Sequence, residues 1–181
     1  MTEILELNKD FAIYLDNSKQ QMILDLKDIL RDKTVNYLFK YTKENIVAYY
    51  FEYEWDFLNI VLWAVDKTGN IVNDALILPT KTDSKANENS KWNAFMPEKI
   101  AKKIFDFQND YEGEDKDEIL ENYEEEKYEL FEKWFCDCWK QTIAETRIKV
   151  DAYFSIHDTS YKTDLNTLEE ITDEQIEKRY K

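Results

Sequence analysis

Residues 45–80 read NIVAYYFEYEWDFLNIVLWAVDKTGNIVNDALILPT and are dense in β-branched and aromatic side chains, which are typical of strands. The segment DKTGN at 66–70 is their one obvious turn. In the first strand Tyr49 and Phe51 would share one face while Glu52 points to the other, as in an antiparallel sheet with one half-exposed face. We therefore expect three strands in a meander, near 45–54, 57–66 and 71–78.

The segments on either side of this stretch show helical spacing of apolar residues. Residues 2–41 predict two helices or one long interrupted helix, with a break at 16–18, where Asp, Asn and Ser are capping side chains. Residues 80–92 are polar, lack periodicity and predict a loop. The sequence MPE at 96–98 then begins a helix, because proline is favoured in a first turn, and a second loop crosses Gly113.

Residues 117–146 contain no glycine or proline and predict one long amphipathic helix. Residues 149–156, KVDAYFSI, alternate again and predict a fourth strand that ends at His157 and Asp158. The tail TDEQIEKRY at 172–180 has the Thr-x-x-Gln pattern of a capping box and predicts a terminal helix. The apolar stripe of the long helix comprises positions 120, 123, 131, 134, 135, 138, 139 and 142.

These elements predict a fold of the α+β class in a single domain spanning residues 1–181. The strands form a meander and a late return instead of alternating with helices, which favours a mostly antiparallel sheet packed against long amphipathic helices. A chain of 181 residues that is 43% hydrophobic and 15% aromatic is long enough to bury a substantial core.

The charge of the chain restricts its partners. Lys and Arg total 24 against 39 Asp and Glu, for a formal net charge of -15. Such a surface repels nucleic-acid phosphates and anionic lipid and favours a basic protein partner, so we expect no direct nucleic-acid binding. Acids at residues 1–10, where a secretory signal carries bases, the lack of an apolar run of about 20 residues and the presence of only two cysteines predict a cytoplasmic protein outside the membrane.

Both cysteines lie in WFCDCW at 134–139, within the predicted helix. On a helix Cys136 and Cys138 are rotated by about 200° from each other, so they cannot share a metal or close a disulfide without unwinding it. We expect Cys138 to be a small core residue and Cys136 a flanking thiol. The remaining alternative is a redox or zinc role.

No motif in the sequence identifies a particular reaction. His157, the only histidine, lies beside Asp158 and near Ser155 and Ser160, which offers the parts of a small hydrolase or transferase. Neighbours at a strand end point in alternating directions, however, and a strand-end turn explains the same residues. With two glycines the chain has no phosphate-cradling loop, and we expect no cofactor, no metal and no catalytic role.

The segment 110–132 is the most acidic part of the chain. It holds twelve acidic residues against Lys116 and Lys127, and so carries ten of the fifteen net negative charges. Like charges four apart on a helix cost a few tenths of a kcal/mol per pair, so this block is either a solvated face or the surface for a cationic partner. The partner-binding residues we predict are Glu121, Tyr123, Glu124, Glu125, Glu126, Tyr128 and Glu129, because tyrosines interleaved with acids favour recognition.

Two segments carry a resemblance. VAYYFEYEWDFLNIVLWAVDKTGN at 47–70 and VDAYFSIHDTSYKTDLNT at 150–167 resemble small acidic bacterial proteins found as immunity partners of polymorphic or contact-dependent toxins. The resemblance implies a cytoplasmic protein that binds a cognate toxin domain, often a basic nuclease, and blocks its active site or substrate path. It implies no particular functional residues.

The leading hypothesis is therefore a non-enzymatic, immunity-type inhibitor that covers a basic toxin or nuclease domain with its acidic face. One alternative is a DNA mimic that inhibits a DNA-binding protein through ordered carboxylates. Another is the small hydrolase or transferase using His157. A third is an adaptor that buries Trp55 and Trp92 in an oligomer.

Overall fold

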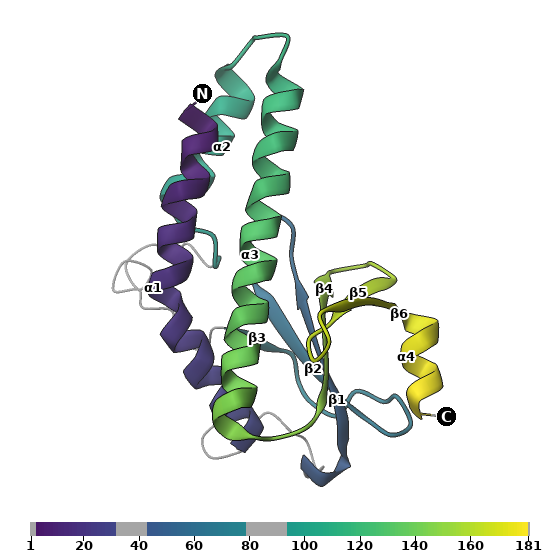
Figure 1. Cartoon of the computed structure of the whole chain (residues 1–181). Helices are drawn as coiled ribbons and strands as arrows, with labels where there is room; N and C mark the ends of the chain where they lie inside the picture. The colour runs from purple at the N-terminus through teal and green to yellow at the C-terminus, as the bar shows by residue number, and fades with distance from the viewer. Residues whose placement is uncertain (1–2, 32–42, 79–93, 181) are drawn as a thin grey trace.

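The computed structural model describes residues 3–31, 43–78 and 94–180. Within these residues the fold is α+β, with four α-helices and a six-stranded sheet (Figure 1). The elements in chain order are α1 (Glu3–Arg31), a short 3₁₀ helix (Lys43–Asn45), β1 (Ile46–Tyr53), β2 (Ile60–Asp66), β3 (Leu76–Leu78), α2 (Glu98–Asp110), α3 (Lys116–Thr146), β4 (Asp151–Ile156), β5 (Tyr161–Asp164), β6 (Glu169–Thr172) and α4 (Asp173–Tyr180). The loop predicted over 80–92, which includes Trp92, lies outside the described residues.

The sheet has the strand order β3-β2-β1-β4-β5-β6. β1 and β4 run parallel at its centre, and the other neighbouring pairs are antiparallel. The expectation of a mostly antiparallel sheet, made from a meander and one late strand, is therefore wrong: the sheet is mixed and has two further strands. A parallel pair needs a crossover connection, and α2 and α3 lie in the connection between β1 and β4.

The additional strands β5 and β6 form a hairpin from polar sequence. Asp164 holds its turn, since its backbone oxygen accepts from the Leu168 N–H at 2.7 Å and its side chain accepts from the Asn166 N–H at 2.9 Å. Leu168 adopts a positive φ of 63° there. Because the hairpin has little apolar alternation, the sequence contained no clear strand signal for it.

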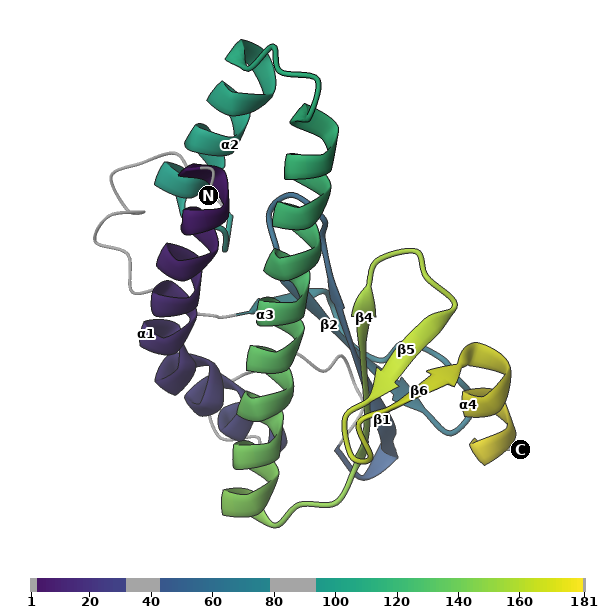
Figure 2. The ribbon, with the colours of Figure 1, turned by 45° about the horizontal axis from the view of Figure 1, so that its top comes forward.

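The two faces of the sheet meet different partners. Tyr49, Phe51 and Tyr53 of β1 point into the main core with α1 and α3. Ala48 of β1 and Tyr153 of β4 belong to a smaller cluster that α4 covers with Ile176. Figure 2 shows α1 and α3 on one side of the sheet and α4 on the other.

The helix α1 is continuous over 29 residues, so the predicted break at 16–18 is wrong. Ser18 does not cap a new helix there, because its hydroxyl donates to the backbone oxygen of Tyr14 within the same helix, at 2.9 Å. The apolar stripe continues through Leu15 and Met22, both buried, and this tertiary packing outweighs local capping preference.

α1 and α3 lie side by side and run in the same direction (Figure 1). Contacts between them advance together along both helices, which fixes their alignment. These contacts are the hydrogen bond Asn8–Glu126 and the ion pairs Lys19–Asp137 and Lys27–Glu145.

Several local predictions are confirmed. The helix expected at 117–146 is α3, and the helix expected after MPE at 96–98 is α2. The capping box before α4 is present, with the Thr172 N–H donating to Gln175 Oε1 at 2.8 Å and the Gln175 N–H donating to Thr172 Oγ1 at 3.3 Å.

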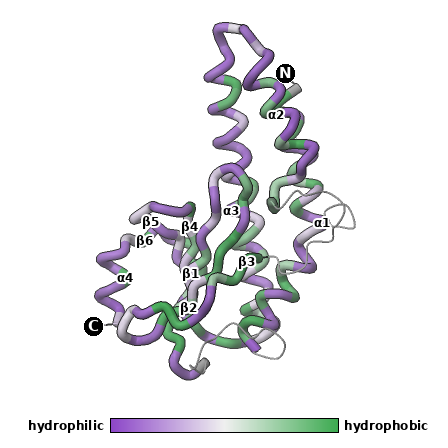
Figure 3. Tube along the Cα trace, turned by 180° about the vertical axis from the view of Figure 1, so that it is seen from behind, coloured by the Kyte–Doolittle hydropathy of each residue, from purple (hydrophilic) through white to green (hydrophobic). Residues whose placement is uncertain are grey.

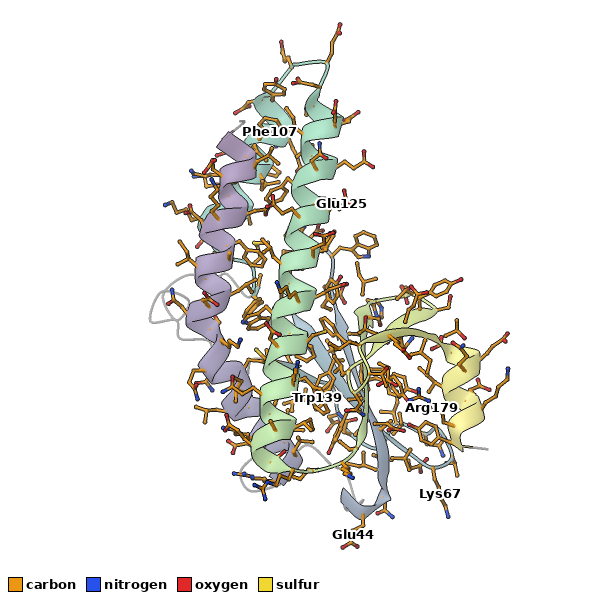
Figure 4. The ribbon with its side chains drawn as sticks, viewed as in Figure 1. Glu44, Lys67, Phe107, Glu125, Trp139 and Arg179 are labelled. Carbon is orange, nitrogen blue, oxygen red and sulfur yellow. The ribbon has the colours of Figure 1, made fainter. Side chains whose placement is uncertain are left out.

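The first half of α3 projects beyond the sheet together with α2 and the start of α1 (Figure 1). Figure 3 shows that hydrophilic residues predominate in this projecting part of α3, whereas its second half lies against the sheet. In Figure 4, Glu125 lies on the projecting part and Trp139 on the part beside the sheet.

Candidate functional site

The predicted partner-binding residues all lie on the projecting half of α3, but on different sides of it. Glu121, Glu125 and Glu129 are exposed and follow one another at four-residue spacing, so they form one row along the helix. Tyr123 is buried, at 2% exposure. The acidic block is therefore not one continuous face.

Glu126 is exposed but has a hydrogen-bond partner in α1. Its carboxylate accepts from Nδ2 of Asn8 at 2.8 Å, and the same amide group donates to the backbone oxygen of Tyr123 at 3.1 Å. Asn8 is 1% exposed, so its bond to the Tyr123 oxygen is buried, whereas its bond to Glu126 is only partly buried. Glu126 thus has a structural partner in α1.

Tyr123 and Glu124 line a pocket of about 500 Å³ between α2, α3 and the turn that joins β1 to β2, which we call the α2–α3 pocket. The turn contributes Asp56 and Phe57. The other residues that line the pocket are Met96, Glu98, Ala101, Lys102, Ile104, Phe105, Gln108 and Lys127. Apolar side chains thus meet a few charged ones in one concavity, the usual composition of a binding site.

Large aromatic side chains are exposed at the edge of this pocket. Phe105 on α2 is 64% exposed and Phe57 is 49% exposed. Trp55 in the same turn as Phe57 is 55% exposed, and its ring meets the Tyr128 ring edge-on at 5.8 Å between centroids. Tyr128 also donates its hydroxyl to the Trp55 backbone oxygen at 3.4 Å. Phe57 and Phe105 line the pocket itself, and Trp55 lies two residues before Phe57 in the same turn.

Lys127 lies in the pocket wall and is only 4% exposed. Its Nζ lies over the ring of Tyr128, 4.2 Å from the centroid, and 5.7 Å from that of Tyr123. Burial lowers the pKa of the Lys127 ammonium, while the charges of Glu124 and Asp56 oppose that shift. Among the described residues no hydrogen bond or ion pair reaches this Nζ.

Lys127 is the site residue that the sequence reasoning missed, because a lysine in an acidic run is normally solvent-exposed. The signal was present in the spacing. The apolar stripe of α3 jumps from 123 to 131, and Lys127 occupies the missing turn between them. A lysine on the buried face of an amphipathic helix is an unusual placement.

His157 does not complete a catalytic triad with the serine on its strand. Its Nδ1 lies 3.3 Å from Glu52 Oε2 and its Nε2 lies 3.4 Å from Asp158 Oδ1, so both ring nitrogens face carboxylates. The hydrogen bond to Glu52 raises the pKa of His157 above its ordinary value. Ser155 is buried, and its Oγ has no hydrogen-bond partner among the described residues. A nucleophile in contact with its base is therefore not formed here.

The cysteines lie on α3 as expected. Both are free; Cys138 is buried in the core and Cys136 is half-buried. Burial raises the pKa of Cys136 to about 11 and that of Cys138 to about 12, which disfavours the reactive thiolate at neutral pH.

A second pocket, of about 720 Å³, lies on the opposite face of the sheet, where Tyr50 and Trp63 are cross-strand neighbours. Its carboxylates already have partners in the protein. Glu52 contacts His157, and Asp66 accepts hydrogen bonds within its own turn, 66–70. Fewer carboxylates are therefore available to a ligand in this pocket than in the α2–α3 pocket.

No family model, curated protein or solved structure matches this chain. None of the helices in the described parts of the chain is both long and apolar enough to cross a membrane. Across residues 3–31, 43–78 and 94–180, no group of three or more His, Cys, Asp or Glu side chains is arranged to hold a metal ion.

Proposed function

We propose that this chain is a non-enzymatic binding protein that holds a basic partner protein at the α2–α3 pocket and inhibits it. The observation that supports the proposal most is the combination, in one concavity, of exposed aromatic rings and carboxylates. Exposed aromatic groups beside a pocket are typical of interfaces, where a few large rings supply most of the binding energy.

In this proposal most of the binding affinity comes from three exposed aromatic side chains at the pocket edge, which we call the aromatic rim. Phe105, Phe57 and Trp55 keep 49–64% of their surface in water, a cost that binding would relieve. Asp56, Glu98 and Glu124 in the same pocket favour a partner segment that carries Lys or Arg next to its apolar residues.

In this proposal the acidic row of Glu121, Glu125 and Glu129 increases the rate of association with the partner. Glu121, Glu125 and Glu129 are exposed on the same half of α3 as the pocket. Charge of this kind steers an oppositely charged protein and can raise association rates to about 10⁸–10⁹ M⁻¹s⁻¹ at low salt. The identity of the partner as a basic toxin or nuclease domain rests on the resemblance of residues 47–70 and 150–167 to immunity-type proteins.

Site-specific photocrosslinking tests the proposal in cells that make the protein. A benzophenone amino acid would replace Phe105 at the pocket edge or, as the matched control, Ile13 on α1. The two side chains are equally accessible, at 64% and 61%, but only Phe105 lines the pocket. We expect an adduct with one basic protein from position 105 and none from position 13.

Equal adducts from both positions would mean that the aromatic rim is not the contact, and no adduct from position 105 would contradict the proposal. Charge reversal of Glu98 and Glu124 to Lys should also weaken the adduct at position 105, because these carboxylates face the same pocket. An adduct of unchanged yield would remove charge complementarity from the argument.

The alternatives have less support. A DNA mimic needs carboxylates that follow two phosphate strands. The exposed row at 121, 125 and 129 is instead a single line, in which successive residues are separated by a rise of about 6 Å along the helix axis. Within the described residues both ring nitrogens of His157 face carboxylates, those of Glu52 and Asp158, and no hydroxyl or thiol that a hydrolase would need contacts the imidazole. If His157→Ala abolished an activity while the crosslinks persisted, the enzymatic alternative would regain support.

A further inference from the structure

The ammonium of Lys127 has unused hydrogen-bonding capacity at the pocket wall. A protonated lysine presents three N–H donors, and a charge on a side chain that is only 4% exposed is costly unless those donors are satisfied. Nζ is in contact with the Tyr128 ring, but a ring face accepts a cation without replacing hydrogen bonds to oxygen.

The surrounding carboxylates do not fill this role within the described residues. Glu124 and Asp56 act on Lys127 only at longer range, since no carboxylate oxygen lies within 4 Å of Nζ. Glu124 and Asp56 also line the pocket themselves, so both stay available to an incoming cation. Within residues 3–31, 43–78 and 94–180 no group accepts from Lys127, so its donors are open to an acceptor that enters the pocket.

The walls around Lys127 define what such an acceptor must be attached to. Phe57, Met96, Ile104 and Phe105 make the pocket predominantly apolar next to the ammonium. A ligand that fills the pocket therefore has an anionic group and an apolar group only a few bonds apart. The last residue of a polypeptide has this form, because its carboxylate and its side chain leave the same carbon atom.

We propose that Lys127 binds the C-terminal carboxylate of the partner protein and that the apolar walls hold the side chain of that last residue. The inference rests on the proposed function, since it assigns the chemistry of the segment that enters the same pocket. Capture of a chain terminus is a known mode of peptide recognition.

The charge balance of the pocket adds a requirement on the residues before the terminus. Lys102 and Lys127 stand against three carboxylates, those of Asp56, Glu98 and Glu124, so the side chains that line the pocket have one excess negative charge. A carboxylate alone would increase this excess. A segment with two Lys or Arg residues before its apolar last residue balances both the excess and its own carboxylate, and therefore binds where a free fatty acid or aromatic acid would be disfavoured.

The test uses fluorescein-labelled hexapeptides with Lys or Arg at the fourth and fifth positions and Leu, Ile, Met or Phe at the last. Each peptide is made as a free acid and as a C-terminal amide, and binding to the whole chain is measured by fluorescence polarisation. We expect the best free acids to bind at least about ten-fold more tightly than their amides, because a charge-assisted hydrogen bond is lost in the amide.

Lys127→Met should remove this acid-over-amide preference, and its matched control, Lys133→Met, should keep it. Lys133 is an exposed lysine on the same helix and outside the pocket. Methionine fills a buried site well, so we expect Lys127→Met to fold and to unfold at the same temperature or higher. The comparison of acid with amide on the native chain needs no variant.

Each outcome has a defined meaning. If acids and amides bind equally and Phe105→Glu abolishes both, the pocket is a protein-binding site and the carboxylate role of Lys127 is wrong. If Lys127→Met retains the acid preference, another group binds the terminus and the inference is also wrong. If no peptide of either kind binds, both the inference and the proposed pocket function fail.

Discussion

The two halves of α3 belong to one helix but have different neighbours. From Phe131 to Thr142 the helix is buried between α1 and the sheet, with aromatic rings in mutual contact. From Lys116 to Tyr128 the only buried residues are Ile119, Tyr123 and Lys127. This half of the helix therefore buries about one side chain in each turn. If the projecting half is the recognition surface, stability and recognition are divided along a single helix, and we expect changes in one half to leave the other largely unaffected.

The sharpest test of this division is a pair of phenylalanine truncations. Phe135→Ala removes a ring that is 0% exposed and stacks on Phe154 with 4.3 Å between centroids. We expect a loss of about 3–5 kcal/mol in the free energy of unfolding, measured with urea. Phe105→Ala at the pocket edge should cost no more than about 0.5 kcal/mol. Equal losses would show that both regions share one core.

Alkaline pH should be the next largest perturbation, because it acts on the thiols of the packed half. The pKa values of Cys136 and Cys138 are raised by burial to about 11 and about 12, so folding favours the protonated thiols. Their contribution to stability is then complete below an ordinary thiol pKa of about 8.5 and is lost as pH rises through the folded values. Urea midpoints at pH 7.5, 9 and 10.5 should fall in that order.

The matched variant for this prediction carries Cys136→Ser and Cys138→Ala together. It should show a shallower decline between pH 9 and 10.5, although tyrosines with raised pKa values, such as Tyr53, continue to contribute. An unchanged slope would assign the alkaline sensitivity to the phenols alone.

We expect a smaller loss in the free energy of unfolding when the contact between α1 and the projecting half of α3 is removed. Asn8→Ala deletes the donor to Glu126 and to the Tyr123 backbone oxygen and should cost about 1–2 kcal/mol. Hydrogen exchange should accelerate for amides near Tyr123 and stay unchanged near Trp139, since Asn8 contacts only the first region. Ser18→Ala, which removes a bond within α1 itself, is the control and should leave exchange in α3 unaltered.

The smallest change in stability should come from the acidic row. Lysine at positions 121, 125 and 129 keeps like charges four residues apart but sets them among the other carboxylates of the segment 110–132, and each such pair is worth only a few tenths of a kcal/mol. We expect unfolding to be unchanged or slightly harder, while association with a basic partner becomes slower and less dependent on salt. A large loss of stability would mean that the row has a structural role.

Local patterns of the sequence predicted what depends on neighbours along the chain. The spacing of apolar residues located α3, and the Thr172 and Gln175 side chains located the start of α4. Residues 16–18 misled the prediction because capping side chains also fit on the exposed side of a helix. Packing of Leu15 and Met22 against the rest of the core decides that α1 continues.

Partners distant along the chain could not be predicted in this way. The alternation in β1 and in β4 tells which side chains share a face, but not that Phe51 lies beside Phe154 in a parallel pair. The same limit applies to the candidate site. Charge counting located the acidic half of α3, whereas the burial of Lys127 depends on how α2 and the turn at Phe57 fold over it.

The parallel pairing of β1 with β4 has a consequence for synthesis on the ribosome. Ala48 pairs with Asp151, so the centre of the sheet joins strands roughly 100 residues apart, and such non-local contacts slow folding. During translation β1 and β2 emerge well before β4, which leaves one edge of β1 unpaired for several seconds at typical elongation rates. An unpaired aromatic strand edge invites aggregation, so yield in a cell should depend on how quickly the chain beyond residue 150 is completed.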